Sequence, residues 1–346
     1  MTLIVGQRSG PLHFMFGDLM ISQQAPGVDS VALPARFDAR LPPVDRRMRG
    51  LRQKIFCVNN KLAVAWAGNV TVARHITMEV AKKTNEELFE CDFNEFLTSL
   101  GLATHELQSV AFMFWAIRDV TKAPQAYYSV DVNTNEWIDP SDPQNKCVFA
   151  GSGEYHFFNL LEHQPHGMVG TVTNAEASFK GVSDIILRAS TAIVDEITKD
   201  DLHDFSYGGG FEVIVPSPGG FIKIPTTQVV WRETADGIEL MGPIYASYYS
   251  ENGVLSIRRF VWNGSAWDQT IFPVNNFLNE REPGDLDPAS DIFTISTVHH
   301  FMSKGRTKTV HKLGMASDFC LRFDGKDFIF APSAELVRLL REWPPK

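Results

Sequence analysis

The sequence has few cysteines, no long apolar run and no excess of basic charge. Its four cysteines stand far apart and form no Cys-x-x-Cys pair, so neither a zinc knuckle nor a dense disulfide framework is indicated. No stretch approaches the roughly 20 apolar residues of a membrane-spanning helix. The first residues have neither the basic nor the long apolar region of an export signal. We therefore expect a cytoplasmic protein with reduced, mostly buried thiols.

The acidic balance of the chain limits its partners. The formal net charge is −9, whereas sequence-independent binding to nucleic acid requires a basic face. We expect no nucleic-acid and no membrane partner, and small or peptide ligands fit better. The 346 residues are 44% hydrophobic and 21% charged, which is typical of a globular protein with one large domain and a smaller one.

Hydrophobic periodicity predicts alternating groups of strands and helices over the first two thirds of the chain. Residues 2–6 and 12–16 form a predicted amino-terminal hairpin, and residues 54–68 form a second one. Helices are predicted at 70–83 and 175–197. Further predicted elements are short helices at 94–100 and 154–161 and strands at 110–117, 126–130, 147–150, 211–215 and 220–224. This order predicts an α+β fold with two sheets inside and helices outside, a four-layer αββα sandwich.

Two segments depart from this alternation. Residues 23–53 lose periodicity and are rich in proline and arginine, which predicts a long basic loop. Beyond about residue 235 the pattern changes to short strands, with a closing helix at 334–343. We therefore divide the chain into a domain of residues 1–235 and a C-terminal β-rich extension of residues 236–346.

The second residue is the first candidate for chemistry. Removal of Met1 leaves Thr2 at the amino terminus, at the start of an apolar strand. A hydroxyl needs an adjacent base at neutral pH, and a terminal threonine carries one in its α-amine. That amine has an ordinary pKa of roughly 7.7 to 8.0, which a nearby lysine lowers. With Asp18 and Lys54 further along the chain, this arrangement is typical of N-terminal-nucleophile hydrolases.

An ordered series of short motifs extends this pattern over residues 2–232. The motifs are Thr2, Asp18, Lys54-Ile55-Phe56, Ala67-Gly68, Gly151-Ser152-Gly153, Asp204-Phe205-Ser206-Tyr207-Gly208-Gly209 and Gly220-Phe221-Ile222-Lys223-Ile224-Pro225. In this order and spacing the chain resembles the proteasome β-subunit family, including its simpler bacterial relatives. The resemblance implies the same four-layer fold.

The resemblance also implies a role for each catalytic position. Thr2 Oγ would attack a carbonyl carbon while its α-amine accepts the proton. Lys54, oriented by Asp18, would supply positive charge beside the nucleophile. The backbone N–H of Gly68 would face the oxyanion that develops during the reaction.

Other residues are implied to position the amine or the substrate. Ser152 and Asp204 would position the α-amine and a shuttling water, and Ser22 matches a position that pairs with the substrate backbone. The serine of the family's Asp-x-x-Ser segment falls on Tyr207, with Ser206 beside it. We therefore include both of these residues as amine-positioning candidates.

The resemblance implies a threonine-type peptidase or amidase that cleaves peptides or unfolded proteins without a cofactor. Subunits of this family assemble into rings that enclose the nucleophile, and an ATP-driven unfoldase feeds some of these assemblies; we therefore expect a homo-oligomer. Two alternatives remain open. The same acyl-enzyme would react with an amine in a transpeptidase or protein ligase, and a non-catalytic scaffold subunit would use the fold alone.

Three histidines raise the question of a metal site. His299, His300 and His311 have no acidic or cysteine ligand at helical spacing. We therefore expect histidines on the surface and no structural metal.

Overall fold

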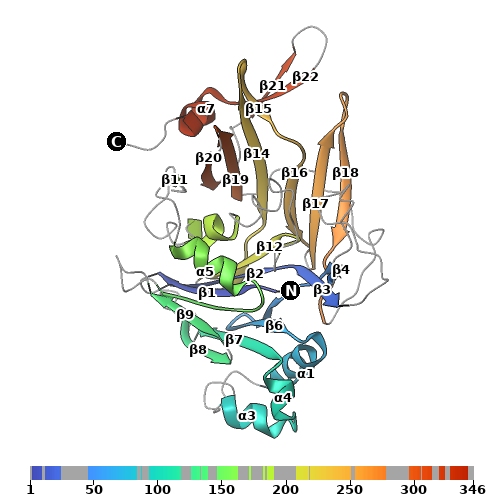
Figure 1. The fold of residues 1–346 in the computed structure, drawn as a ribbon, viewed down its shortest axis with the longest axis vertical. Helices are drawn as coiled ribbons and strands as arrows, with labels where there is room; N and C mark the ends of the chain where they lie inside the picture. Colours follow the sequence, from blue (N-terminus) through green and yellow to red (C-terminus); the bar gives the residue numbers. More distant parts are fainter. Residues whose placement is uncertain are drawn as a thin grey trace.

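The computed structural model describes residues 2–9, 12–24, 46–83, 87, 93–117, 126–132, 134–138, 146–162, 171–172, 182–183, 185–190, 208–217, 219–250, 254–277, 296–304, 306–313, 319–323 and 328–341. Most of these residues lie in β-strands and fewer lie in helices, so sheet predominates in the expected mixture. Figure 1 shows one sheet above, one across the middle and one with helices below. Among the described residues, no helix has both the length and the apolar character needed to cross a membrane.

The middle sheet is antiparallel and contains the expected amino-terminal hairpin. Strands β1 (Ile4–Ser9) and β2 (Leu12–Asp18) pair with Ile4 opposite Gly17. The six strands follow the order β13-β12-β2-β1-β10-β9. The others are β9 (Asn135–Ile138), β10 (Lys146–Ala150), β12 (Phe211–Ser217) and β13 (Gly220–Lys223). Successive side chains of a strand point to opposite faces, so the apolar run of β1 requires cover on both sides of the sheet.

A four-stranded sheet packs against one face of this sheet. Its strands lie in chain order and are β5 (Ile55–Asn59), β6 (Leu62–Gly68), β7 (Val110–Ile117) and β8 (Ala126–Val132). Small side chains of β6, including Ala63 and Ala65, share one buried cluster with Ile4 and Met15 of the six-stranded sheet. These small residues allow the two sheets to approach closely.

Helices cover the outer face of each of these sheets. Helices α1 (Val70–Val80) and α3 (Phe93–Ser99) pack on the four-stranded sheet, and α4 (Thr104–Leu107) lies before β7. Asn69 caps the N-terminus of α1, and its side chain accepts hydrogen bonds from two N–H groups of the first turn. On the six-stranded sheet lie α5 (Glu154–Glu162) and helical residues 182–183 and 185–190, which are the part of the predicted helix at 175–197 that the structure describes.

The third large sheet holds most of the C-terminal region. It has eight strands in the order β11-β20-β19-β14-β16-β17-β18, and β15 pairs with β14 beside this path. The strands are β11 (Thr171–Val172), β14 (Thr226–Thr234), β15 (Gly237–Leu240), β16 (Ile244–Tyr249), β17 (Leu255–Trp262), β18 (Trp267–Pro273), β19 (Ser296–Ser303) and β20 (Arg306–Leu313). Helix α7 (Ala334–Arg341) adds Leu336 to the core that surrounds Trp231.

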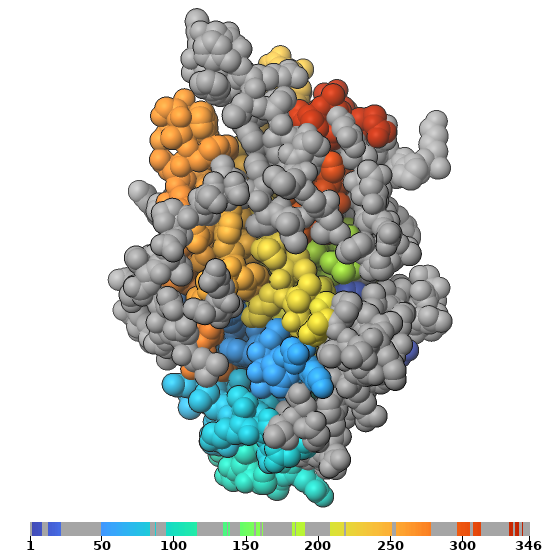
Figure 2. All heavy atoms as spheres, turned by 180° about the vertical axis from the view of Figure 1, so that it is seen from behind, coloured from blue at the N-terminus to red at the C-terminus, as the bar shows by residue number. Residues whose placement is uncertain are grey.

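The expected division after residue 235 falls between β14 and β15, inside this sheet. Strand β14 precedes the division, yet it pairs with β16 and β19, which follow it. A further buried cluster joins the two parts of the chain and consists of Leu19, Met20, Leu51, Leu255, Ile257 and Val274. In Figure 2 the orange and yellow segments lie above the blue and cyan segments. The C-terminal region is therefore packed against residues next to the amino-terminal hairpin.

The predicted loop at residues 23–53 has strands at both of its ends. Strand β3 (Met20–Gln24) pairs with β4 (Arg46–Leu51), and residues 25–45 lie outside the described residues. The prediction of a loop was wrong for these ends because Met20 and Leu51, which face each other in the pair, pack into the cluster shared with the C-terminal sheet. A second small hairpin joins β21 (Phe319–Phe323) and β22 (Phe328–Pro332).

Candidate active site

The candidate site is built on a buried ion pair between Lys54 and Asp18. Asp18 ends β2, and Lys54 directly precedes β5. Lys54 Nζ donates a hydrogen bond to Asp18 Oδ1 and another, of 2.7 Å, to the Met20 carbonyl oxygen. Neither charged side chain is exposed to solvent. Because buried charges require both pairing and hydrogen bonds, each of these residues depends on the other.

The Asp18 carboxylate also holds the start of the chain. Its Oδ1 accepts a second hydrogen bond, of 2.7 Å, from the Leu3 N–H. Its Oδ2 accepts a hydrogen bond of 3.0 Å from the Gly208 N–H. The Asp18 N–H donates in return to the Leu3 carbonyl oxygen at 3.0 Å. The Lys54 ammonium and the peptide group between Thr2 and Leu3 therefore share one carboxylate oxygen.

Thr2 is enclosed by the Gly151-Ser152-Gly153 turn and is only 4% exposed. Thr2 N, which becomes the α-amine when Met1 is removed, donates to Ser152 Oγ at 3.0 Å. The Gly153 N–H donates to the Thr2 carbonyl oxygen, also at 3.0 Å. A Cβ on Gly151 would lie 2.4 Å from that carbonyl oxygen and 2.8 Å from the Thr2 hydroxyl oxygen. Gly151 also has a φ of +107°, so glycine is required there on both grounds.

Burial sets the electrostatics of the ion pair. It lowers the pKa of Lys54 below the ordinary lysine value, and the negative charges of Asp18 and Glu212 oppose this shift. Burial raises the pKa of Asp18, and the Lys54 ammonium together with the Leu3 and Gly208 N–H groups opposes that shift. Because the groups that form hydrogen bonds with the Asp18 side chain are all donors, the geometry fits the carboxylate form of Asp18.

Gly68 stands at the end of β6, where it is exposed. It has a φ of +102°, and a Cβ there would lie 2.2 Å from the Ser109 carbonyl oxygen. Two residues earlier, the Trp66 N–H donates to the Lys54 carbonyl oxygen at 3.0 Å. Strand β6 is thereby fixed to the segment that carries the lysine, while the role of Gly68 as an oxyanion donor stays a prediction.

Four predicted site residues are located by the backbone alone or lie outside the described residues. Asp204, Ser206 and Tyr207 lie outside the described residues. Ser22 lies in β3, opposite Met48 of β4. Among the remaining predicted residues, hydrogen bonds connect Thr2 N with Ser152, and Asp18 with Lys54.

Sequence reasoning missed Glu212, a buried carboxylate that contacts the Lys54 segment. Its Oε1 accepts hydrogen bonds from the N–H groups of Lys54, at 2.7 Å, and Ile55, at 2.8 Å. A signal was present, because Glu212 is the one charged residue in the apolar run 211–215. A charge inside a buried strand indicates a buried partner.

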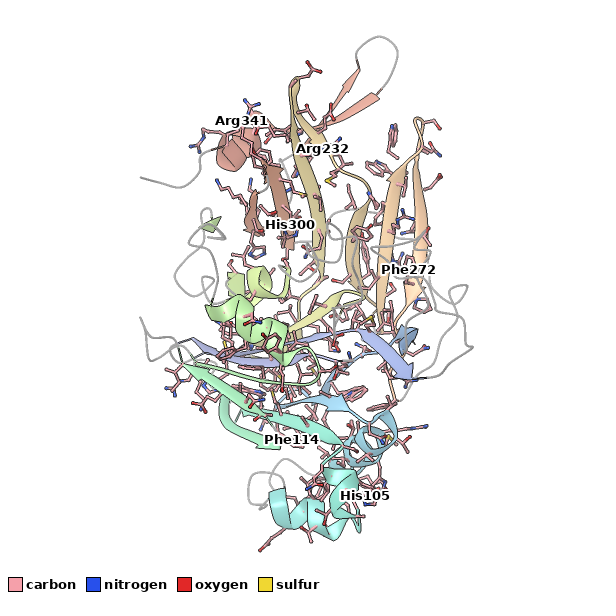
Figure 3. The ribbon with its side chains drawn as sticks, in the orientation of Figure 1. His105, Phe114, Arg232, Phe272, His300 and Arg341 are labelled. Atoms are coloured by element: carbon pink, nitrogen blue, oxygen red, sulfur yellow. The ribbon has the colours of Figure 1, made fainter. Side chains whose placement is uncertain are left out.

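The expectation of surface histidines was wrong, because His299, His300 and His311 are all buried. They lie on β19 and β20, and Figure 3 labels His300 within the upper sheet. His311 lies between the hydroxyl groups of Ser183 and Ser296, each 2.8 Å from a ring nitrogen. Adjacent strand residues point to opposite faces, so both faces of β19 are covered here. Among the described residues, no group of three or more His, Cys, Asp or Glu is placed to hold a metal ion.

No family model matches the chain, and no curated protein matches it. A function therefore has to be proposed from the residues and the geometry of the chain itself.

Proposed function

We propose that this chain is an N-terminal-nucleophile hydrolase of the threonine type, a peptidase or amidase that works in the cytoplasm. One observation carries the proposal: Asp18 Oδ1 accepts hydrogen bonds from both Lys54 Nζ and the Leu3 N–H. A buried ammonium and the first peptide group of the processed chain thus meet at one carboxylate oxygen. A cation near a terminal threonine lowers the pKa of its α-amine, which is the base that the hydroxyl needs.

The order of the layers supports the same class. Helix α5 covers the six-stranded sheet, that sheet packs on the four-stranded sheet, and helices α1 and α3 cover the far side. This order agrees with the four-layer αββα sandwich that the resemblance to proteasome β-subunits implies. The eight-stranded sheet is an addition to that sandwich.

Acylation would begin at Thr2. In the processed chain the neutral α-amine takes the hydroxyl proton as Thr2 Oγ forms a bond with the carbonyl carbon of the substrate. The tetrahedral intermediate then breaks its carbon–nitrogen bond, and the departing amine takes the proton from the α-ammonium. The acyl part remains as an ester of Thr2. Ser152 Oγ, 3.0 Å from Thr2 N, positions the amine for both transfers.

Charge stabilisation and deacylation complete the cycle. The Lys54 ammonium favours the negative charge that develops near Thr2, and the Gly68 N–H would donate to the oxyanion. Loss of one such donor raises an activation barrier by about 2.7 to 4 kcal/mol. Water then adds to the ester with the α-amine as base, the carboxylic acid leaves, and the Thr2 hydroxyl is restored.

The proposed substrates are peptides or unfolded proteins. We further propose a homo-oligomer that encloses Thr2, with an ATP-driven unfoldase as partner, on the strength of the family resemblance. An enclosed chamber predicts elution far above the 38.7 kDa mass of one chain. Elution as a lone protomer would contradict the chamber.

Hydrolysis of a mixed set of fluorogenic peptide amides tests the activity. The enzyme preparation is protein whose intact mass shows that it begins at Thr2. We expect hydrolysis by the unaltered chain and none by Thr2→Ala. Thr71→Ala, which removes an exposed threonine hydroxyl from α1, serves as the matched control and should hydrolyse normally. Equal rates in the unaltered chain and Thr2→Ala would contradict the proposal. An added acceptor peptide reveals ligation, because a joined product forms when an amine rather than water resolves the ester.

A further inference from the structure

Glu212 binds the main chain of Lys54 rather than its ammonium. It lies on β12 and is not exposed to solvent. Its Oε1 accepts from the Lys54 N–H at 2.7 Å and from the Ile55 N–H at 2.8 Å. Two successive amide groups on one carboxylate oxygen fix the direction of the chain at the entry to β5.

The second oxygen of Glu212 is occupied as well. Oε2 accepts from Gln53 Nε2 at 3.2 Å and from Lys223 Nζ at 2.9 Å. Lys223 Nζ also donates to the Ile55 carbonyl oxygen at 2.9 Å. The four donors match the roughly four lone-pair positions of a carboxylate. Glu212 therefore acts on its protein neighbours and not on a substrate.

The C-terminal region reaches the same segment from beyond β18. The Gln53 N–H donates to the Asn275 carbonyl oxygen at 2.8 Å, and Gln53 Oε1 accepts from Asn276 Nδ2 at 3.1 Å. The ring of Phe277 stacks on that of Phe56, with 5.1 Å between the centroids. The residues on both sides of Lys54 are thus anchored to remote parts of the chain.

We propose that Glu212 is a positioning residue of the candidate active site, which holds the Lys54 main chain so that the ammonium meets Asp18. This inference rests on the proposed function of Lys54 beside Thr2. In Glu212→Gln one of the two acceptor oxygens becomes a donor NH2 group, so the amide cannot accept from the N–H groups of Lys54 and Ile55 and from Gln53 and Lys223 at once, and the segment must shift. A displacement of about 1 Å can lower a catalysed rate by about 10²-fold.

The charge of Glu212 gives the proposal a distinct signature. Burial lowers the pKa of Lys54, and the Glu212 charge is one of those that oppose the shift. Replacement of Glu212 by a neutral residue of the same shape should therefore lower the pKa of Lys54 further. If activity requires the Lys54 ammonium, the rate falls on the alkaline side of its pH profile as Lys54 loses its proton. In the variant this alkaline limb of the pH–rate profile then moves to lower pH. The shift of this limb reports the charge of Glu212, whereas a lowered inactivation rate in the folded protein reports its positioning role.

The experiment measures covalent inactivation by a peptide epoxyketone as a function of pH, with thermal unfolding recorded for each protein. The variants are Glu212→Gln and the double variant Glu212→Gln/Lys223→Met, which also removes the cation left without its carboxylate. Glu136→Gln is the matched control, because Glu136 pairs with Lys146 at the surface.

We expect Glu212→Gln to lower the maximal inactivation rate about tenfold or more, with the half-saturating concentration unchanged within about twofold. Its alkaline limb should move to lower pH, while Glu136→Gln matches the unaltered chain. The double variant should recover thermal stability but keep the lowered inactivation rate; recovery of the rate would overturn the inference. A folded Glu212→Gln protein with unaltered rate and limb would overturn the positioning role and leave the proposed function standing. Unaltered protein that begins at Thr2 and resists inactivation would overturn both.

Discussion

Lys54 donates a hydrogen bond to Asp18 inside the core, where neither side chain reaches solvent. The same carboxylate oxygen accepts the Leu3 N–H, so the pair is tied to the first residues of the chain. Because the interior stabilises neither charge alone, the free energy of unfolding and the geometry around Thr2 should depend on the two residues together.

A double-mutant cycle on this pair should be strongly non-additive. Asp18→Asn leaves the Lys54 ammonium buried without its counterion, and Lys54→Met leaves the Asp18 carboxylate buried without its own. Each substitution should lower the free energy of unfolding by about 3 to 5 kcal/mol. The double variant should lose much less than the sum of the two, because no isolated charge remains. Urea unfolding near neutral pH measures all four proteins. Additive losses would contradict the buried pair.

Gly151→Ala should damage the site more than an equivalent change elsewhere. The new Cβ would lie 2.8 Å from the Thr2 hydroxyl oxygen and 2.4 Å from the Thr2 carbonyl oxygen. Gly264→Ala is the control, because Gly264 has a similar φ of +98° but no atom within 4 Å of the new Cβ. We expect about 1 to 3 kcal/mol from backbone strain in both variants and a further loss in Gly151→Ala. Equal losses, measured by urea unfolding, would show that the turn is not shaped around Thr2.

Two buried histidines should make the fold sensitive to acid. Burial lowers the pKa of His300 to about 3 and that of His311 to about 4, from 6.5. Below pH 6.5 the unfolded chain therefore binds more protons than the folded one, and their contribution to stability declines as pH falls toward the folded pKa values. It is fully present above pH 6.5.

The variant His300→Gln isolates one of these contributions. Between neutral pH and about pH 5, a histidine with this shift loses about 2 kcal/mol of stability. The unaltered chain should therefore lose about 2 kcal/mol more than His300→Gln over that range, as measured by urea unfolding at both pH values. Identical losses would mean that His300 accepts a proton in the folded state.

A fragment of residues 1–235 should not fold on its own. Strand β14 would be present without β16 and β19, which pair with its two edges. Trp231, fully buried in the complete chain, would lose its cover. We expect aggregation and no cooperative thermal transition. A soluble fragment that unfolds cooperatively would instead support residues 1–235 as an independent domain.

The local sequence pattern was sufficient to predict the helices and strands next to the candidate site. The hairpin of β1 and β2, helix α1 and the hairpin of β12 and β13 all follow from apolar periodicity and turn residues close in sequence. The pairing of Asp18 with Lys54 was implied by the resemblance to proteasome β-subunits. The structure contains a buried hydrogen bond between the two side chains, while the chemical role of the pair stays a prediction.

Contacts between residues far apart in the sequence could not be predicted from it. Glu212 meets the Lys54 N–H across 158 positions, and no spacing rule links two such residues. The burial of His300 depends on Gln228 of β14, whose Oε1 lies 2.8 Å from the histidine Nε2. Strands β14 and β19 lie parallel, so a long connection separates these partners in the sequence.

Mass spectrometry of the protein after exposure to a peptide epoxyketone addresses the nucleophile itself, since this reagent requires both the threonine hydroxyl and the free α-amine. Protein that begins at Thr2 should carry one adduct per chain, located on Thr2, and Thr2→Ala should carry none. Protein shown to begin at Thr2 that carries no adduct would contradict a working N-terminal nucleophile and favour a non-catalytic scaffold.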